Sequence, residues 1–89
     1  MVHTDETIIS NSLGLHARPA SLIVKVASQY QCDITLEKDG ETVNGKSIMG
    51  LLMLSAGHGS SIKITAVGSD GADALKALME LFEKKFHEE

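Results

Sequence analysis

The sequence predicts an α+β fold, an open-faced two-layer sandwich in which helices cover one face of a sheet and solvent wets the other. Two segments, residues 31–37 and 60–67, alternate apolar and polar side chains, as a strand with one wet face does. Three others carry apolar residues at helical spacing. With two further strands, the predicted order is β-α-β-β-α-β-α within one domain, residues 1–89.

The strands follow from residue type and from turn chemistry. Residues 6–11 contain a Thr-Ile-Ile run and give the first strand. An Asp-Gly pair after residues 31–37 favours a tight hairpin, and the return strand follows at 41–44. Strands with one wet face need helices on the other face only, which is the reason for expecting an open side.

The helices are predicted at residues 17–30, at 47–57 and from Asp70 onward, with Asp70 as a cap. The third helix has one apolar stripe, made of Leu75, Leu78, Met79, Phe82 and Phe86. The charge run EKKFHEE at 83–89 is expected to be a solvated, fraying helix end.

Composition excludes several classes of protein. One cysteine excludes a disulfide framework, and no Cys/His group has zinc spacing, so we expect no metal site and no cofactor. The chain has no apolar run of membrane-spanning length and no leader-like start, which favours the cytoplasm. A net charge of −4 argues against nucleic-acid binding.

The stretch GLHARPA, residues 14–20, holds the only proline of the chain. With His16 as the N-cap, Pro19 falls in the first helical turn, where its missing N–H is no loss. The N–H groups of Ala17 and Arg18 then have no intrahelical acceptor and point outward. Gly14 allows a sharp turn into the helix.

This arrangement favours an anion next to a nucleophile. A helix N-terminus attracts anions, and the guanidinium of Arg18 suits phosphate oxygens. Neutral imidazole is nucleophilic, so His16 is a candidate for transient phosphorylation. From the residues alone, a plain surface or capping histidine remains an alternative.

A second stretch, NGKSIMG, places Ser47 at the start of the short helix, where its first role is to cap. A phosphate added to that hydroxyl would also be tolerated electrostatically. The apolar residues that follow cannot all face the core, so some are expected on the surface, where methionines suit several partners.

The two motifs together resemble the HPr family, the histidine-containing phosphocarriers of the bacterial phosphoenolpyruvate-dependent phosphotransferase system. The resemblance covers essentially the whole chain and implies four antiparallel strands with three helices on one face. It implies that phospho-enzyme I phosphorylates His16 at Nδ1 and that EIIA domains accept the group. Arg18 and the backbone N–H of Ala17 would hold the phosphate. Such a protein is a carrier and not a multi-turnover enzyme.

The resemblance also implies regulation and docking. An HPr kinase/phosphorylase would modify Ser47 and slow transfer at His16, as part of carbon catabolite regulation. The apolar partner patch would be Ile48, Met49, Leu52 and Met53. We expect a monomer with brief encounters and no insertion into membranes.

Several readings stay open at this point. Met53 and His58 depart from the sugar-system pattern. The LLML stretch is more similar to HPr-like proteins of proteobacteria, including a nitrogen-related regulatory branch. A binding module that recruits a transcription factor through phosphorylated Ser47 is another alternative, and a ligand-sensing sandwich is a weaker one. His3, His58 and His87 are expected to be surface residues in loops or near the ends, and Cys32 a buried hydrophobe.

Overall fold

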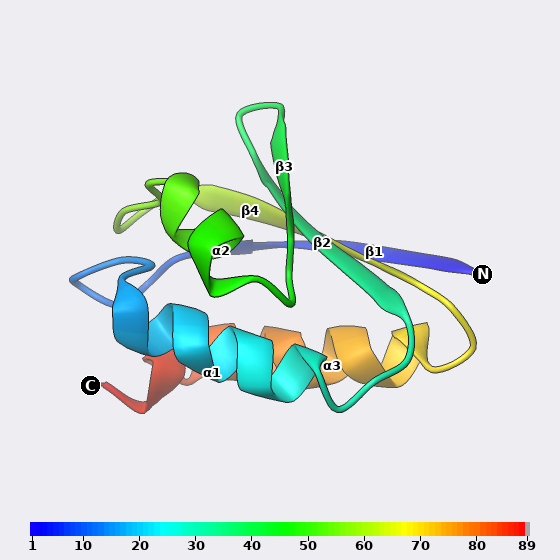
Figure 1. The fold of residues 1–89 in the computed structure, drawn as a ribbon. Helices are drawn as coiled ribbons and strands as arrows, with labels where there is room; N and C mark the ends of the chain where they lie inside the picture. Colours follow the sequence, from blue (N-terminus) through cyan, green and yellow to red (C-terminus); the bar gives the residue numbers. More distant parts are fainter. Residues whose placement is uncertain (89) are drawn as a thin grey trace.

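The predicted order of elements is confirmed by the structure, a computed structural model that describes residues 1–88 (Figure 1). A short turn, η1, follows the last helix. The elements are β1 (Val2–Ile8), α1 (Ala17–Ala27), β2 (Asp33–Lys38), β3 (Glu41–Asn44), α2 (Ile48–Met53), β4 (Ser61–Val67), α3 (Gly71–Glu83) and η1 (Lys85–His87).

The strands form one antiparallel sheet in the order β1-β4-β2-β3. The predicted hairpin joins β2 to β3, with Lys38 opposite Glu41. Its two turn residues, Asp39 and Gly40, have φ of +52° and +83°. Two successive residues with positive φ make the tight turn whose twist suits a hairpin, which is why Asp-Gly stands here.

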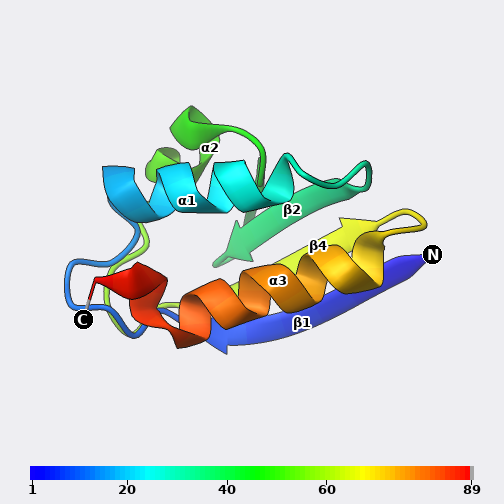
Figure 2. The same ribbon diagram turned by 90° about the horizontal axis from the view of Figure 1, so that it is seen from below.

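The sheet has one covered and one open face. In β4 the apolar residues Ile62, Ile64 and Ala66 are buried, whereas Ser61 and Lys63 are exposed. Helices α1 and α3 run across the covered face, and α2 packs against α1 and β3 (Figures 1 and 2). One hydrophobic core lies between these two layers, as the two-layer prediction requires.

The first strand was placed wrongly by residue type. It spans Val2–Ile8 instead of 6–11, because its whole length pairs with β4, from Val2 opposite Val67 to Ile8 opposite Ser61. His3 therefore lies in a strand and is half-buried, not in a loop. Helix α1 also ends earlier than predicted, at Ala27.

The start of α3 differs from the prediction in its chemistry. Asp70 occupies the N-cap position, but its side chain does not cap the helix. Its carboxylate accepts hydrogen bonds from the backbone N–H groups of Gln31 at 2.7 Å and Cys32 at 3.0 Å. These bonds hold the pKa of Asp70 below its ordinary value. Asp70 thus ties the segment before β2 to α3.

Cys32 itself is buried, as predicted. Burial is the main cause that raises the pKa of its thiol, and the neighbouring Asp70 carboxylate acts in the same direction. A neutral, buried thiol behaves as a small hydrophobe and not as a nucleophile.

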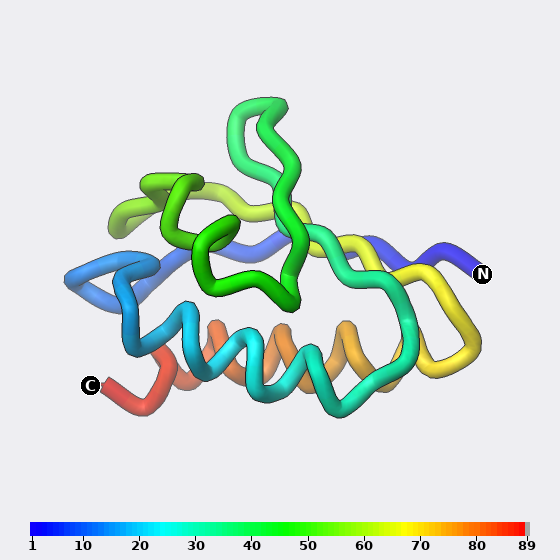
Figure 3. The backbone as a smooth tube through the Cα atoms, viewed as in Figure 1, coloured from blue at the N-terminus to red at the C-terminus, as the bar shows by residue number. Residues whose placement is uncertain are grey.

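The end of the chain does not fray over its described part. After α3, residues Lys85, Phe86 and His87 have φ of +52°, +55° and +61°, so the backbone turns with left-handed geometry. Phe86 is buried and its ring meets that of Phe82 edge-on, with centroids 4.8 Å apart. The chain therefore folds back beneath the loop that precedes α1, as the tube in Figure 3 shows. The prediction of a solvated, fraying helix end was wrong for Phe86, which is buried, whereas Glu83, Lys84 and His87 are exposed as predicted. Glu89 lies outside the described residues.

Candidate functional site

His16 is the N-cap of α1, as predicted. Its backbone is extended, with φ −89° and ψ −169°, and its carbonyl accepts the first helical bond, from the N–H of Ala20 at 3.0 Å. Its side chain caps nothing. The imidazole is therefore free for other contacts, while the start of the helix keeps N–H groups that the side chain does not satisfy.

The loop before His16 is held in place by Gly14 and Leu15. Gly14 has φ +72°, and a Cβ atom there would lie 2.7 Å from both the carbonyl oxygen of Ala56 and the Cα atom of Gly57. The N–H of Leu15 donates to that same carbonyl oxygen at 2.8 Å. This close approach between two backbone segments needs a glycine and fixes where α1 begins.

The first turn of α1 is arranged as the sequence predicts. Ala17 and Arg18 are exposed, and Pro19 is buried. The N–H groups of the first two positions have no intrahelical acceptor by their place in the helix. Arg18 forms no ion pair with any residue among 1–88. An anion at this helix end would meet N–H donors without intrahelical acceptors and an exposed guanidinium.

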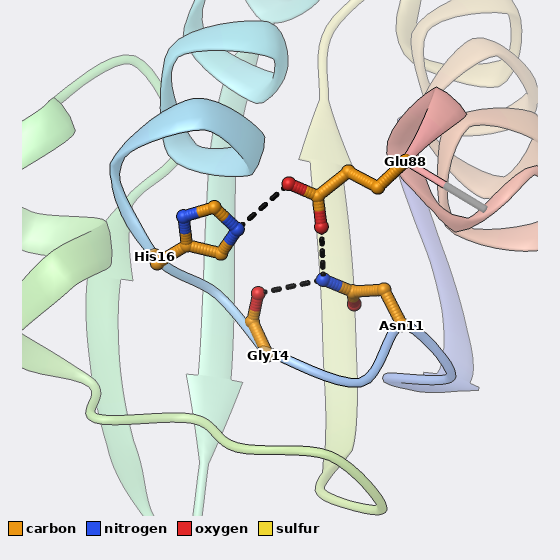
Figure 4. Close-up of polar contacts among 4 residues, drawn as sticks. All are labelled: Asn11, Gly14, His16 and Glu88. Atoms are coloured by element: carbon orange, nitrogen blue, oxygen red, sulfur yellow. Dashed lines mark hydrogen bonds and ion pairs between the residues drawn. The ribbon is translucent and has the colours of Figure 1, made fainter.

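The end of the chain supplies a partner for His16 that the sequence analysis missed. Nε2 of the imidazole lies 2.7 Å from Oε2 of Glu88 (Figure 4). The other carboxylate oxygen of Glu88 accepts a hydrogen bond at 2.9 Å from Nδ2 of Asn11, which also donates to the carbonyl of Gly14 at 2.8 Å. His16, Glu88, Asn11 and Gly14 thus form one connected cluster, and we call it the Glu88 cluster.

The Glu88 cluster sets the roles of the two ring nitrogens. An ionised carboxylate only accepts hydrogen bonds, so in the neutral imidazole this contact favours the tautomer in which Nε2 carries the proton and donates a hydrogen bond to Glu88. Nδ1 then has the free lone pair, and it lies on the other side of the ring from Glu88 (Figure 4). Of the two side chains, His16 is 37% exposed and Glu88 only 12%. The side chain of His16 is therefore the more accessible of the two, and the side chain of Glu88 is sheltered.

Ser47 is the N-cap of α2, as predicted. Its Oγ accepts a hydrogen bond from the N–H of Gly50 at 3.1 Å. Lys46 does not reach toward α2, because its ammonium group donates to the carbonyl of Tyr30 at 2.7 Å. Ser47 is half-buried, and its hydroxyl oxygen already caps the helix.

The predicted partner patch is on the surface. Leu51 is the buried residue of α2, and the four predicted residues are exposed, namely Ile48 at 40%, Met49 at 70%, Leu52 at 37% and Met53 at 66%. Helices α1 and α2 lie side by side (Figures 1 and 2). The exposed apolar side chains and His16 are therefore carried by neighbouring helices.

Other kinds of site find little support in the described part of the chain. Residues 1–88 contain no group of three or more His, Cys, Asp or Glu side chains able to hold a metal ion. No helix within that range is both long enough and apolar enough to cross a membrane. A groove of about 390 Å³ is lined by residues of β2 and β3 and by Lys46, and His16 is not among them.

Known proteins share this fold and these motifs. The family model for the PTS HPr component phosphorylation site matches residues 3–84. A phosphocarrier protein HPr from Xylella fastidiosa is 44% identical over 84 residues, 94% of each chain. The crystal structure of HPr-C-His from Thermoanaerobacter tengcongensis superposes with a TM-score of 0.94 at 46% identity, covering 98% of both chains. The crystal structure of an HPr dimer from the same organism superposes with a TM-score of 0.77 at 48% identity, and the match covers 90% of this chain and 92% of that chain.

A match over nearly the whole chain agrees with the resemblance carried by GLHARPA and NGKSIMG. The four antiparallel strands and the helices on one face agree with it as well. The chain belongs to the HPr family of phosphocarrier proteins of the phosphotransferase system.

Proposed function

We propose that this protein is a cytoplasmic phosphocarrier that accepts a phosphoryl group on Nδ1 of His16 from phospho-enzyme I and passes it to EIIA domains. The observation that carries the proposal concerns the two ring nitrogens: Nε2 contacts Glu88, and Nδ1 has no partner among residues 1–88 and lies beside the start of α1. Membership of the HPr family supports the same function.

The surroundings of His16 suit a transient phosphoryl group. The N–H groups of Ala17 and Arg18 and the positive end of α1 can meet phosphate oxygens, and the Arg18 guanidinium can add a charged hydrogen bond. Membership of the HPr family supports a protein that carries the group from one partner to another and is not a multi-turnover enzyme.

Intact-mass spectrometry tests the proposal directly. After incubation with phosphoenolpyruvate and enzyme I, the wild type is expected to gain one phosphoryl group that is lost in acid. His16→Ala should gain none while keeping the wild-type circular dichroism spectrum. Ser47→Ala is the matched control and should gain the group as the wild type does. Equal phosphorylation of His16→Ala would refute the proposal.

A regulatory phosphorylation of Ser47 is a second candidate function. Its hydroxyl stands at the start of α2, next to the exposed apolar patch, and added negative charge there would oppose partners that dock on apolar side chains. With ATP and an HPr kinase/phosphorylase, the wild type should gain one acid-stable phosphoryl group and then accept phosphate at His16 more slowly. Labelling of Ser47→Ala at the wild-type level would contradict this role.

The pathway and the assembly state are separate parts of the proposal. We propose sugar uptake through EIIA domains and a monomeric carrier, with the nitrogen-related branch as the alternative for the pathway. Because a related HPr from Thermoanaerobacter tengcongensis forms a dimer, light scattering after size exclusion is the test of the assembly state. A mass near 9.5 kDa is expected, and twice that mass would contradict it.

A further inference from the structure

We propose that Glu88 is a positioning residue for phosphoryl transfer, which holds His16 as the Nε2–H tautomer and remains as the counter-ion of the ring after Nδ1 is phosphorylated. This inference rests on the proposed carrier function. It adds a part of the chain that neither motif contains, because Glu88 lies 72 residues beyond His16.

The first support is the geometry of the carboxylate. Each of its two oxygens has one partner, Nε2 of His16 at 2.7 Å and Nδ2 of Asn11 at 2.9 Å. Asn11 is fully buried and is itself held by the carbonyl of Gly14 at 2.8 Å. The carboxylate is therefore fixed from the side opposite the imidazole, and its direction determines where the ring can lie.

The second support is one unsatisfied buried atom within the Glu88 cluster. Both hydrogens of the Asn11 amide group are used for its two contacts, so its oxygen Oδ1 cannot be exchanged with Nδ2 by a flip. That buried Oδ1 has no hydrogen-bond partner within residues 1–88. A buried amide that leaves one atom unsatisfied points to a role other than stability.

The third support is the backbone that brings Glu88 to the site. Lys85, Phe86 and His87 all have positive φ, and none is a glycine. Three successive L residues in this region are disfavoured, so the surrounding structure must hold them. The buried ring of Phe86, packed edge-on against Phe82, supplies one anchor. The Glu88 cluster supplies the other, and the strained turn delivers a carboxylate to His16.

The chemical step then balances without an additional proton acceptor. The lone pair of Nδ1 attacks the phosphorus atom of the donor as the bond from phosphorus to the donor atom breaks. The electron pair of the broken bond returns to that donor atom. Nε2 keeps its proton, so the His16 ring gains a positive charge while it carries the phosphoryl group. The Glu88 carboxylate lies next to that charge, and transfer to the next acceptor reverses each change.

The first test needs no phosphorylation. In ¹⁵N spectra of the neutral imidazole, the wild type is expected to be mainly the Nε2–H tautomer. Glu88→Ala should raise the proportion of the other tautomer severalfold. Glu83→Ala, which removes an exposed carboxylate from the end of α3, is the matched control and should leave the tautomers unchanged. An unchanged ratio in Glu88→Ala overturns the proposal.

The second test measures phosphorylation by enzyme I. Glu88→Ala should accept the group roughly tenfold more slowly, a usual loss when the carboxylate that orients a histidine is removed. Its KM toward enzyme I should stay at the wild-type value. Glu88→Gln offers a carbonyl oxygen to Nε2–H, so it should keep the wild-type tautomer but lose phosphoryl groups by hydrolysis faster than the wild type. Wild-type rates in Glu88→Ala overturn the proposal.

The two tests separate this inference from the carrier function. A tautomer change in Glu88→Ala, together with no phosphorylation of the wild type, would refute the carrier function and support the role of Glu88 in holding the ring. Phosphorylation of the wild type, with Glu88→Ala equal to it in both tests, would support the carrier function and refute the role of Glu88. Circular dichroism melts of each variant show whether the fold is retained.

Discussion

The starts of α1 and α2 differ in what the side chain of the N-cap residue does. At α2, the side chain of Ser47 accepts a hydrogen bond from the helix it begins, 3.1 Å from the N–H of Gly50. At α1, the side chain of His16 caps nothing and turns to Glu88. A serine at a helix start is accounted for by stability alone. Stability alone does not account for a histidine whose side chain leaves the helix end uncapped.

This difference supports our proposal that the start of α1 is the one that takes part in phosphoryl transfer. Around His16, the buried Oδ1 of Asn11 lacks a partner among residues 1–88, and a left-handed turn brings in Glu88. Such features persist where the surrounding structure imposes them, and they concentrate at functional sites. The Oγ atom of Ser47 already accepts its capping hydrogen bond from Gly50, so the start of α2 needs no phosphate for its stability.

The largest effect on stability is expected from Gly14→Ala. A Cβ atom there would lie 2.7 Å from two backbone atoms in a residue with φ +72°, so we expect a loss of about 2–4 kcal/mol of unfolding free energy and a displaced His16. Gly40→Ala is the matched control, because Gly40 has φ +83° but no neighbouring atom within 4 Å. It should cost about 1 kcal/mol. Urea unfolding measures both, and equal losses would contradict the close approach at Gly14.

The comparison of the two caps predicts changes of opposite sign. Ser47→Ala removes a working cap and should lower the free energy of unfolding by about 1 kcal/mol. His16→Ser introduces a cap in an extended backbone that suits one, and should raise it by up to about 1 kcal/mol while abolishing phosphorylation. Chemical denaturation gives both values. His16→Ala loses the same contact to Glu88 and gains no cap, so it is the reference. A His16→Ser variant less stable than His16→Ala would show that the start of α1 is not open for a cap.

A smaller, pH-dependent effect is expected at the start of α3. The N–H groups of Gln31 and Cys32 hold the pKa of Asp70 below its ordinary value. Because the pKa of Asp70 is lower in the folded protein, its carboxylate stabilises the fold at any pH above the pKa of the unfolded chain. This stabilisation is lost as the pH falls through the lower pKa of the folded protein. The wild type should therefore be more stable than Asp70→Asn at pH 6, and the difference should shrink below about pH 4. A difference that grows in acid would contradict the assignment.

Local chemistry in the sequence was enough to predict much of the site. The positions of His16 and Ser47 as N-caps and the Asp39-Gly40 turn follow from residues within a few positions of one another. The extent of β1 did not follow, because pairing with β4 determines it and not the residue types of the strand.

The Glu88 cluster could not be predicted in the same way. Glu88 is 72 residues from His16 and 77 from Asn11 in the sequence. The left-handed turn before Glu88 contains no glycine from which it could have been predicted. One signal was available, the aromatic Phe86 inside an otherwise charged run. An aromatic side chain there needs burial, which requires the chain to fold back. Spacing alone assigned Phe86 to a helical stripe.

The most direct test of the account is to identify the phosphorylated nitrogen by ¹⁵N–³¹P correlation in protein labelled at His16. The account predicts that phosphorus is bonded to Nδ1, with Nε2 protonated and Glu88 still adjacent to it. Phosphorus bonded to Nε2 would contradict it, because that nitrogen is the one held by Glu88 at 2.7 Å.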